Sequence, residues 1–179
     1  MIIGVTGTIG SGKGTVVSRL EKRGFRHVSV SGFLADKAVQ RGIPATRITL
    51  RNIGNEYRAK GATALIEAVL AEENPKKEDI AVESLHTVAE VEYVQHLGGQ
   101  VIAVDAPLPV RWERVKKEGG IKDGSHDEFV AEQDHQMASA NPDENNLAAA
   151  MAAADFHIVN DGTLEEFSGK VDAVIGEIL

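Results

Sequence analysis

The chain has 179 residues, 42% of them hydrophobic, so it is long and apolar enough to fold around the core of one domain. It contains no cysteine, which excludes disulfide bonds, thiolate metal sites and a cysteine nucleophile. The net charge is −8 without a basic cluster, which disfavours a nucleic-acid surface, and no apolar run approaches the roughly 20 residues of a membrane span. We therefore expect a cytoplasmic monomer or small homo-oligomer with neither a nucleic-acid nor a membrane partner.

The hydrophobic pattern predicts strands that alternate with helices along the chain. The predicted strands are residues 2–5, 28–30, 80–82, 101–104 and 156–159. The predicted helices cover residues 13–23 and 33–41, stretches that begin near 46, 61 and 107, the apolar repeat 88–97, and residues 127–138, 144–153 and 164–178. Thr163 and Glu166 form a capping box before the last helix, and the polar segment 118–126 is predicted to be a mobile loop.

This alternation predicts an α/β fold with three layers, in which a five-stranded parallel sheet is covered by helices on both faces. The pattern shows no internal repeat and no linker. Residues 1–179 are therefore predicted to form a single domain.

A glycine-rich segment joins the first strand to the first helix, which is the context of a P-loop. It consists of Gly7, Thr8, Ile9, Gly10, Ser11, Gly12, Lys13, Gly14 and Thr15. Backbone amides of such a loop point inward, the helix N-terminus adds partial positive charge, and Lys13 supplies a full charge. The segment predicts binding of ATP with Mg²⁺; the alternative is a glycine-rich turn with an incidental lysine. Gly14 occupies the usual position of the magnesium-binding hydroxyl, so we assign that role to Thr15.

The loop pattern G-x-x-G-x-G-K-G-T resembles that of adenylate kinases and related nucleoside monophosphate kinases, above all archaeal adenylate-kinase-related proteins. Further segments that resemble these proteins are 29–34, 57–58, 88–92 and 104–107, and the ending 154–164 resembles one shared with dephospho-CoA kinases. The resemblance implies a P-loop NTPase fold with strand order 2-3-1-4-5. It also implies a helical acceptor-binding segment at about 31–73 and a lid at about 114–128.

Two arginines, Arg111 and Arg114, precede the polar segment 118–126. Phosphoryl transfer depends on cations that neutralise the transferred group, so we predict that these arginines belong to a lid that closes over the γ-phosphate and excludes water. The resemblance favours Arg114 as the direct contact. The alternative is a solvated basic helix face.

Three more arginines, Arg47, Arg51 and Arg58, recur at a spacing that places them on one helix face. An anionic acceptor phosphate would offset their mutual repulsion, which predicts a substrate-binding role; pairing with glutamates elsewhere is the alternative. The resemblance favours Arg58.

Glu83 follows the third predicted strand, where it could bind Mg²⁺ through water or orient the acceptor, or else only cap a helix or lie at the surface. The related kinases usually have Asp-Gly-x-Arg here, whereas this chain has Glu83, Ser84, Leu85 and His86. His86 is predicted to replace the arginine as a neutral or pH-dependent hydrogen-bond donor to the substrate, with a plain surface histidine as the alternative. The Asp and Arg that the resemblance implies after the second strand are replaced by Gly32 and Ala35.

The loop after the fifth predicted strand contains Asn160 and Gly162. The resemblance implies that both lie beside the adenine of ATP, although their turn chemistry explains them nearly as well. Asp105, before Pro107, is interpreted mainly as a turn former.

These residues predict an ATP-dependent phosphotransferase that moves the γ-phosphoryl group to an acceptor. The resemblance implies that this acceptor is a nucleoside or deoxynucleoside monophosphate. The resemblance of the ending leaves dephospho-CoA kinase as an alternative. The replacements at Gly32 and Ala35 leave a third one, a nucleotide-binding switch or slow ATPase with a degenerate acceptor site.

Overall fold

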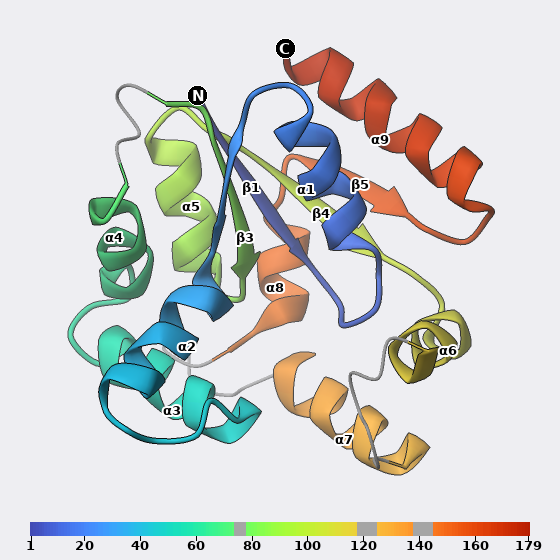
Figure 1. Cartoon of the computed structure of the whole chain (residues 1–179). Coiled ribbons are helices and arrows are strands. Elements are labelled where there is room, and N and C mark those ends of the chain that lie inside the picture. Colours follow the sequence, from blue (N-terminus) through green and yellow to red (C-terminus); the bar gives the residue numbers. More distant parts are fainter. Residues whose placement is uncertain (74–77, 118–124, 138–144) are drawn as a thin grey trace.

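The computed structural model describes residues 1–73, 78–117, 125–137 and 145–179. Parallel strands form one sheet in the order β2-β3-β1-β4-β5, which confirms the predicted fold and strand order (Figure 1). The strands are β1 (Ile2–Gly7), β2 (Arg26–Ser29), β3 (Ile80–Leu85), β4 (Gln100–Asp105) and β5 (Phe156–Val159). β1 lies at the centre of the sheet, between β3 and β4.

Helices cover both faces of this sheet (Figure 1). They are α1 (Lys13–Glu21), α2 (Val30–Gln40), α3 (Arg47–Arg58), α4 (Ala64–Ala71), α5 (Val88–His96), α6 (Leu108–Lys117), α7 (His126–Met137), α8 (Leu147–Ala152) and α9 (Leu164–Ile178). No helix within the described part of the chain has the length and apolarity to cross a membrane.

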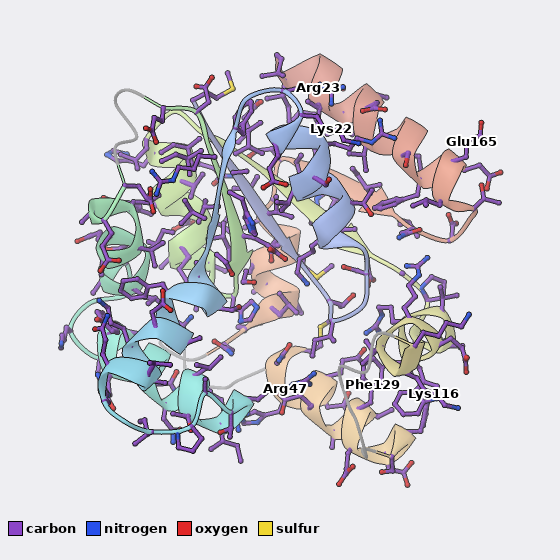
Figure 2. The ribbon with its side chains drawn as sticks, viewed as in Figure 1. Lys22, Arg23, Arg47, Lys116, Phe129 and Glu165 are labelled. Atoms are coloured by element: carbon purple, nitrogen blue, oxygen red, sulfur yellow. The ribbon has the colours of Figure 1, made fainter. Side chains whose placement is uncertain are left out.

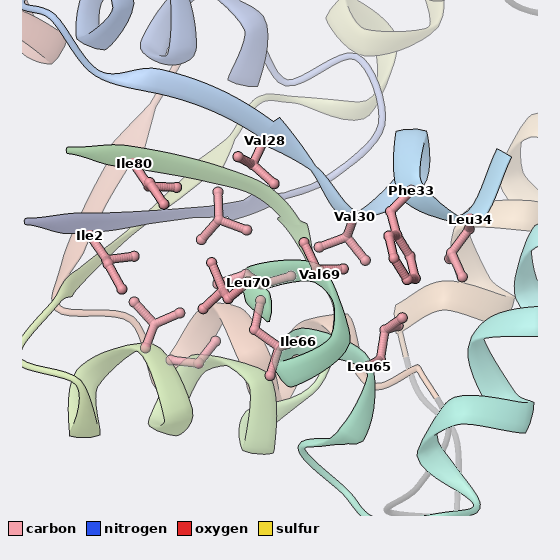
Figure 3. Close-up of a cluster of buried hydrophobic side chains, with 14 of the residues drawn as sticks. Ile2, Val28, Val30, Phe33, Leu34, Leu65, Ile66, Val69, Leu70 and Ile80 are labelled. Atoms are coloured by element: carbon pink, nitrogen blue, oxygen red, sulfur yellow. The ribbon is translucent and has the colours of Figure 1, made fainter. Parts of the chain in front are cut away.

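The sheet carries a separate hydrophobic core on each face, because successive strand residues point to opposite sides. Ile2 and Ile80 belong to the core that α2, α4 and α5 cover, and Figure 3 shows how Ile66 of α4 points into it. Ile3 and Ile102 belong to the second core, which α1 and α9 cover. The strand ends that carry the loops are thereby fixed between two packed layers.

Helix termini differ from the predicted ones where a cap decides them. α2 begins before the predicted residue 33, because the Ser29 hydroxyl accepts a hydrogen bond from the amide of Gly32 at 3.1 Å. α8 begins at Leu147, after the capping residue Asn146. The predicted capping box of Thr163 and Glu166 is confirmed at the start of α9.

The predicted acceptor-binding segment, residues 31–73, contains most of α2 together with α3 and α4. The predicted lid, residues 114–128, and the predicted mobile loop, 118–126, fall partly outside the described residues, as do the predicted helix ends at 138 and 144. The described parts of the lid are the end of α6 and the start of α7.

Gly7→Ala should lower the free energy of unfolding by at least about 2 kcal/mol. The φ angle of Gly7 is +143°, and an added Cβ would lie 2.0 Å from the carbonyl oxygen of Val104 in β4. Gly14→Ala is the matched control, because its Cβ would meet nothing within 4 Å and alanine favours helix by about 1 kcal/mol. Urea unfolding measures both variants, and a Gly7→Ala protein as stable as the unmodified chain would contradict this close approach of β1 and β4.

Candidate active site

The P-loop lies at the carboxyl end of β1, the edge at which parallel α/β sheets bind their ligands. The Lys13 ammonium donates hydrogen bonds to the backbone oxygens of Gly7 and Thr8, each at 2.9 Å, so the side chain folds back across the loop. Burial lowers the pKa of Lys13, while the nearby Glu83 carboxylate acts in the opposite direction. An anionic phosphate at this position would stabilise the charged ammonium.

Asp105, at the end of β4, holds the P-loop in place. Its carboxylate accepts a hydrogen bond of 2.7 Å from the hydroxyl of Thr8, which is buried. The interpretation of Asp105 as mainly a turn former is therefore wrong. Its place at the carboxyl end of a strand next to β1 was a signal that could have pointed to this role.

Arg114 and Asn160 cross the P-loop from α6 and from the loop after β5. Arg114 donates to the backbone oxygens of Gly10 and Ser11 at 3.3 and 3.4 Å and to the side-chain oxygen of Asn160 at 3.0 Å. The Asn160 amide in turn donates to the Ser11 oxygen at 2.8 Å. Gly162 lies in the turn before α9, where an added Cβ would approach the Glu166 carboxylate. The structure thus brings the first two predicted residues together at the loop and places Gly162 in the adjacent turn.

Arg111 is buried and joins α6 to the P-loop and to α7. Its guanidinium donates to the backbone oxygens of Ala106 at 2.7 Å and Ile9 at 3.4 Å, and to the side chain of Gln133. It also lies 5.8 Å from the ring centre of Phe129, an α7 residue that packs on Trp112 of α6 (Figure 2). Burial lowers the pKa of Arg111. All these partners are groups of the protein itself, so the predicted contact of Arg111 with the γ-phosphate stays a prediction.

A groove beside the P-loop collects most of the residues predicted for ATP and Mg²⁺. It is lined by Gly10, Gly12, Lys13, Gly14, Thr15, Glu83, Arg114, Asn160 and Leu164. Thr15 and Glu83 offer hydroxyl and carboxylate oxygens, the ligand type that Mg²⁺ prefers, and this ion commonly keeps several waters and phosphate oxygens as its other ligands. The Glu83 carboxylate lies 3.1 Å from the His27 ring, which orients it from β2. The donor set therefore fits Mg²⁺ together with a bound polyphosphate.

A second cavity of about 280 Å³ adjoins the P-loop and contains every predicted acceptor residue. Its lining residues are Gly7, Ile9, Lys13, Val30, Ser31, Leu34, Arg47, Leu50, Arg51, Arg58, Ser84, His86, Glu132, Gln136 and Asn145. The three arginines predicted to share one face of α3 line this cavity, and their substrate-binding role stays a prediction. We call it the acceptor cavity after that predicted role. Lys13 lines both the groove and this cavity.

Arg58 forms a buried ion pair with Glu90 of α5. Its Nε and Nη2 donate to one carboxylate oxygen at 2.9 and 2.8 Å, and the side chains are only 4% and 0% exposed. The other oxygen of Glu90 accepts from the amides of His86 and Thr87 at 2.8 and 3.3 Å. The charge of Arg58 is therefore compensated inside the protein. Sequence analysis gave Glu90 no role, although its position three residues after Thr87 fits the capping box that the structure shows.

The other two arginines of α3 are less tightly paired. Arg51 lies 3.9 Å from the carboxylate of Glu132 in α7, and Glu132 lines the same cavity. Arg47 lies at the end of α3 that faces α7 (Figure 2), and within the described residues it forms no ion pair. These two side chains supply the cationic wall of the acceptor cavity.

His86 is held neutral in the acceptor cavity. Burial lowers its pKa to about 3, with further contributions from the charges of Lys13 and Arg58. A neutral imidazole offers one N–H donor and one nitrogen acceptor. The prediction of a neutral or pH-dependent donor is thus narrowed to a neutral group at physiological pH.

The site and the fold together define a class of protein. Residues 3–136 match a protein family described as an AAA domain, so the chain belongs to this family, and its loop and parallel sheet are those of a P-loop nucleotide-binding fold. A UPF0200 protein of Pyrococcus abyssi is 31% identical over 187 residues, which cover 100% of this chain and 97% of the relative. The chain belongs to the UPF0200 family.

Two kinases of known structure share the fold. The chain superposes on dephospho-CoA kinase from Campylobacter jejuni with a TM-score of 0.53 and 18% identity, over 99% of this chain and 96% of the other. For shikimate kinase from Aquifex aeolicus the TM-score is 0.59 at 18% identity, over 99% and 97% of the two chains. These likenesses support a kinase-like P-loop fold, and the closer relation to adenylate kinases stays a prediction.

His86→Gln should reduce the loss of stability between pH 6.5 and 5. The pKa of His86 is about 3 in the folded chain and 6.5 in its unperturbed state. The unfolded chain therefore takes up a proton that the folded chain rejects, and stability falls as the pH drops below about 6.5, by at most about 1.4 kcal/mol per pH unit. Thermal unfolding at several pH values measures the effect, with His96→Gln at the exposed end of α5 as control. Identical pH profiles of His86→Gln and the unmodified protein would contradict the low pKa.

Proposed function

We propose that the chain is an ATP-dependent phosphotransferase that moves the γ-phosphoryl group of ATP to a small anionic acceptor, a nucleoside or deoxynucleoside monophosphate. The observation that supports this proposal most is that Lys13 lines both the P-loop groove and the acceptor cavity. A γ-phosphate bound at this ammonium group would face the oxygen of an acceptor in the neighbouring cavity. In-line transfer requires this placement of donor and acceptor.

The groove supplies charge neutralisation for the donor. The loop amides, the N-terminus of α1 and Lys13 would hold the β- and γ-phosphates, and Arg114 reaches across the same loop. Thr15, and Glu83 through water, would hold Mg²⁺, which when bound neutralises charge on the phosphate oxygens. The acceptor oxygen forms a bond to the γ-phosphorus while the bond to the bridging oxygen of ADP breaks, and ADP leaves with that electron pair.

The acceptor cavity supplies binding energy for an anion. Arg47 and Arg51 can bind a phosphate group because neither is committed to a close internal ion pair among the described residues. Glu132 lies near Arg51 and would have to release it when the acceptor enters. Arg58 contributes to the local potential, although Glu90 accepts both of its strongest hydrogen bonds.

A second function, an ATP-binding switch or slow ATPase, is favoured by the same internal pairing. Arg58 is compensated by Glu90 and His86 is neutral, so two of the four predicted acceptor residues bring little net positive charge to the cavity. The two functions make opposite predictions about the response of ATP turnover to an acceptor.

A coupled ADP-release assay with a panel of acceptors tests the proposal. The panel contains AMP, GMP, CMP, UMP, their deoxy forms and dephospho-CoA, each with ATP and Mg²⁺. Stimulation by a nucleoside monophosphate supports the proposed function, and stimulation by dephospho-CoA alone would replace it with the alternative acceptor. ATP binding without stimulation by any member would favour the switch.

Lys13→Ala should reduce turnover roughly 10²- to 10³-fold or more, because it removes the cation that stabilises the transferred group. Lys22→Ala is the matched control, since Lys22 is exposed at the opposite end of α1 (Figure 2). Steady-state ADP release measures both variants, and circular dichroism verifies that they are folded. Turnover of Lys13→Ala equal to that of Lys22→Ala would contradict the role of the P-loop.

Arg51→Ala should raise the KM for the acceptor roughly 10- to 100-fold and leave the KM for ATP nearly unchanged, because a charge-assisted hydrogen bond to the acceptor is lost. Arg41→Ala provides the control, as Arg41 lies at the exposed end of α2 and pairs with Glu56 at the surface. Initial rates over a matrix of ATP and acceptor concentrations separate the two KM values. A rise in the KM for ATP alone would place Arg51 outside the acceptor site.

A further inference from the structure

Ser84 has an unusual backbone conformation at the edge of the acceptor cavity. Its φ angle is +74°, and within the described residues it is the sole residue other than glycine with a positive φ. It is the extra residue of a bulge in β3, because Val5 pairs with Glu83 and Thr6 pairs with Leu85. Glycine adopts this conformation without strain, whereas a side chain makes it costly.

The surrounding contacts keep Ser84 in this conformation. The hydroxyl of Thr6 donates to the carbonyl oxygen of Leu85 at 2.7 Å, and Glu90 accepts from the amide of His86 at 2.8 Å. The carbonyl oxygen of His86 accepts from the amide of Asn146 at 3.0 Å. None of these bonds uses the Ser84 hydroxyl, so the turn does not require a serine.

Ser84 instead lies at a corner of the acceptor cavity that carries uncharged polar side chains. Ser84, His86 and Asn145 all line this cavity, and the bond from Asn146 to His86 brings Asn145 next to the end of β3. The side-chain oxygen of Asn145 is buried without a hydrogen-bond partner among the residues that the structure describes. Buried polar groups are normally hydrogen-bonded, so this corner is suited to a polar ligand group.

We propose that Ser84 is a specificity-determining residue, whose hydroxyl binds an uncharged polar group of the acceptor together with His86 and Asn145. The cavity would then recognise two different groups of the acceptor. The anionic group would face Arg47 and Arg51, and an uncharged group, either a sugar hydroxyl or a base amide or carbonyl, would face β3. This inference rests on the proposed function. Strained residues persist chiefly where the strain serves binding or catalysis, which explains a serine at a position that glycine would relax.

Two substitutions separate binding from strain. Ser84→Ala removes the hydroxyl and keeps the strained side chain, whereas Ser84→Gly removes both. The probe is the nucleoside monophosphate that gives the unmodified protein its highest turnover. Both variants should raise the KM for this acceptor roughly 3- to 10-fold and leave the KM for ATP unchanged. Ser84→Gly should also melt about 2–4 °C above Ser84→Ala.

The outcomes are distinguishable. Acceptor-stimulated turnover with an unchanged acceptor KM in both variants would overturn this inference and leave the proposed function in place. An unmodified protein without acceptor-stimulated turnover would overturn both. A loss of acceptor affinity in both variants, with a gain of stability in Ser84→Gly alone, supports the inference, because a purely structural serine would not produce that combination.

Discussion

The position of the Lys13 ammonium group depends on how firmly the P-loop is held from outside. Its carbonyl partners belong to Gly7 and Thr8, so a shift of the loop displaces the charge directly. Asp105 fixes Thr8 from β4, and Asn160 fixes the loop backbone from the segment after β5. The P-loop groove and the acceptor cavity are both lined by Lys13. The electrostatic effect of this ammonium group is large because the group is partly withdrawn from water. The placement of this charge therefore depends on contacts from β4 and from the segment after β5, both of which are distant from the loop in sequence.

The acceptor cavity gains its electrostatic character from pairs rather than from isolated charges. Arg58 and Glu90 are both buried, and breaking such a pair by removing one partner typically costs about 3–5 kcal/mol. A phosphate group in this cavity would therefore compete poorly for Arg58 but readily for Arg51, whose acidic neighbour lies 3.9 Å away. The fixed cations Arg58 and Lys13 also disfavour a proton on His86. One wall of the cavity consequently carries cations that can exchange their partners for a ligand. The other wall carries the neutral His86 in a fixed position.

The sequence predicted those features that depend on residue spacing within one element. Features that depend on contacts between distant segments could not be predicted in this way. The capping box of Thr163 and Glu166 and the loop around Lys13 follow from residue spacing within a single element, and both lie where the sequence placed them. The pairing of Glu90 with Arg58, 32 residues away, depends on how the tertiary fold brings the end of α3 to the start of α5, and no sequence periodicity indicates that approach. The positive φ of Ser84 likewise arises from a bulge between two strands rather than from its own preference.

The residues that depart from the kinase pattern can be explained together by the chemistry of the acceptor cavity. Gly32 and Ala35 remove expected charges, which alone would suit a decayed site. A decayed site, however, gives no reason for a serine in this costly conformation, since glycine at that position would stabilise the fold. His86, neutral and beside Ser84 in the same cavity, replaces a permanent cation with a hydrogen-bonding group. The combination of a strained serine and a neutral histidine in one cavity therefore supports the proposed acceptor site, with altered selectivity, more than a site that has ceased to bind.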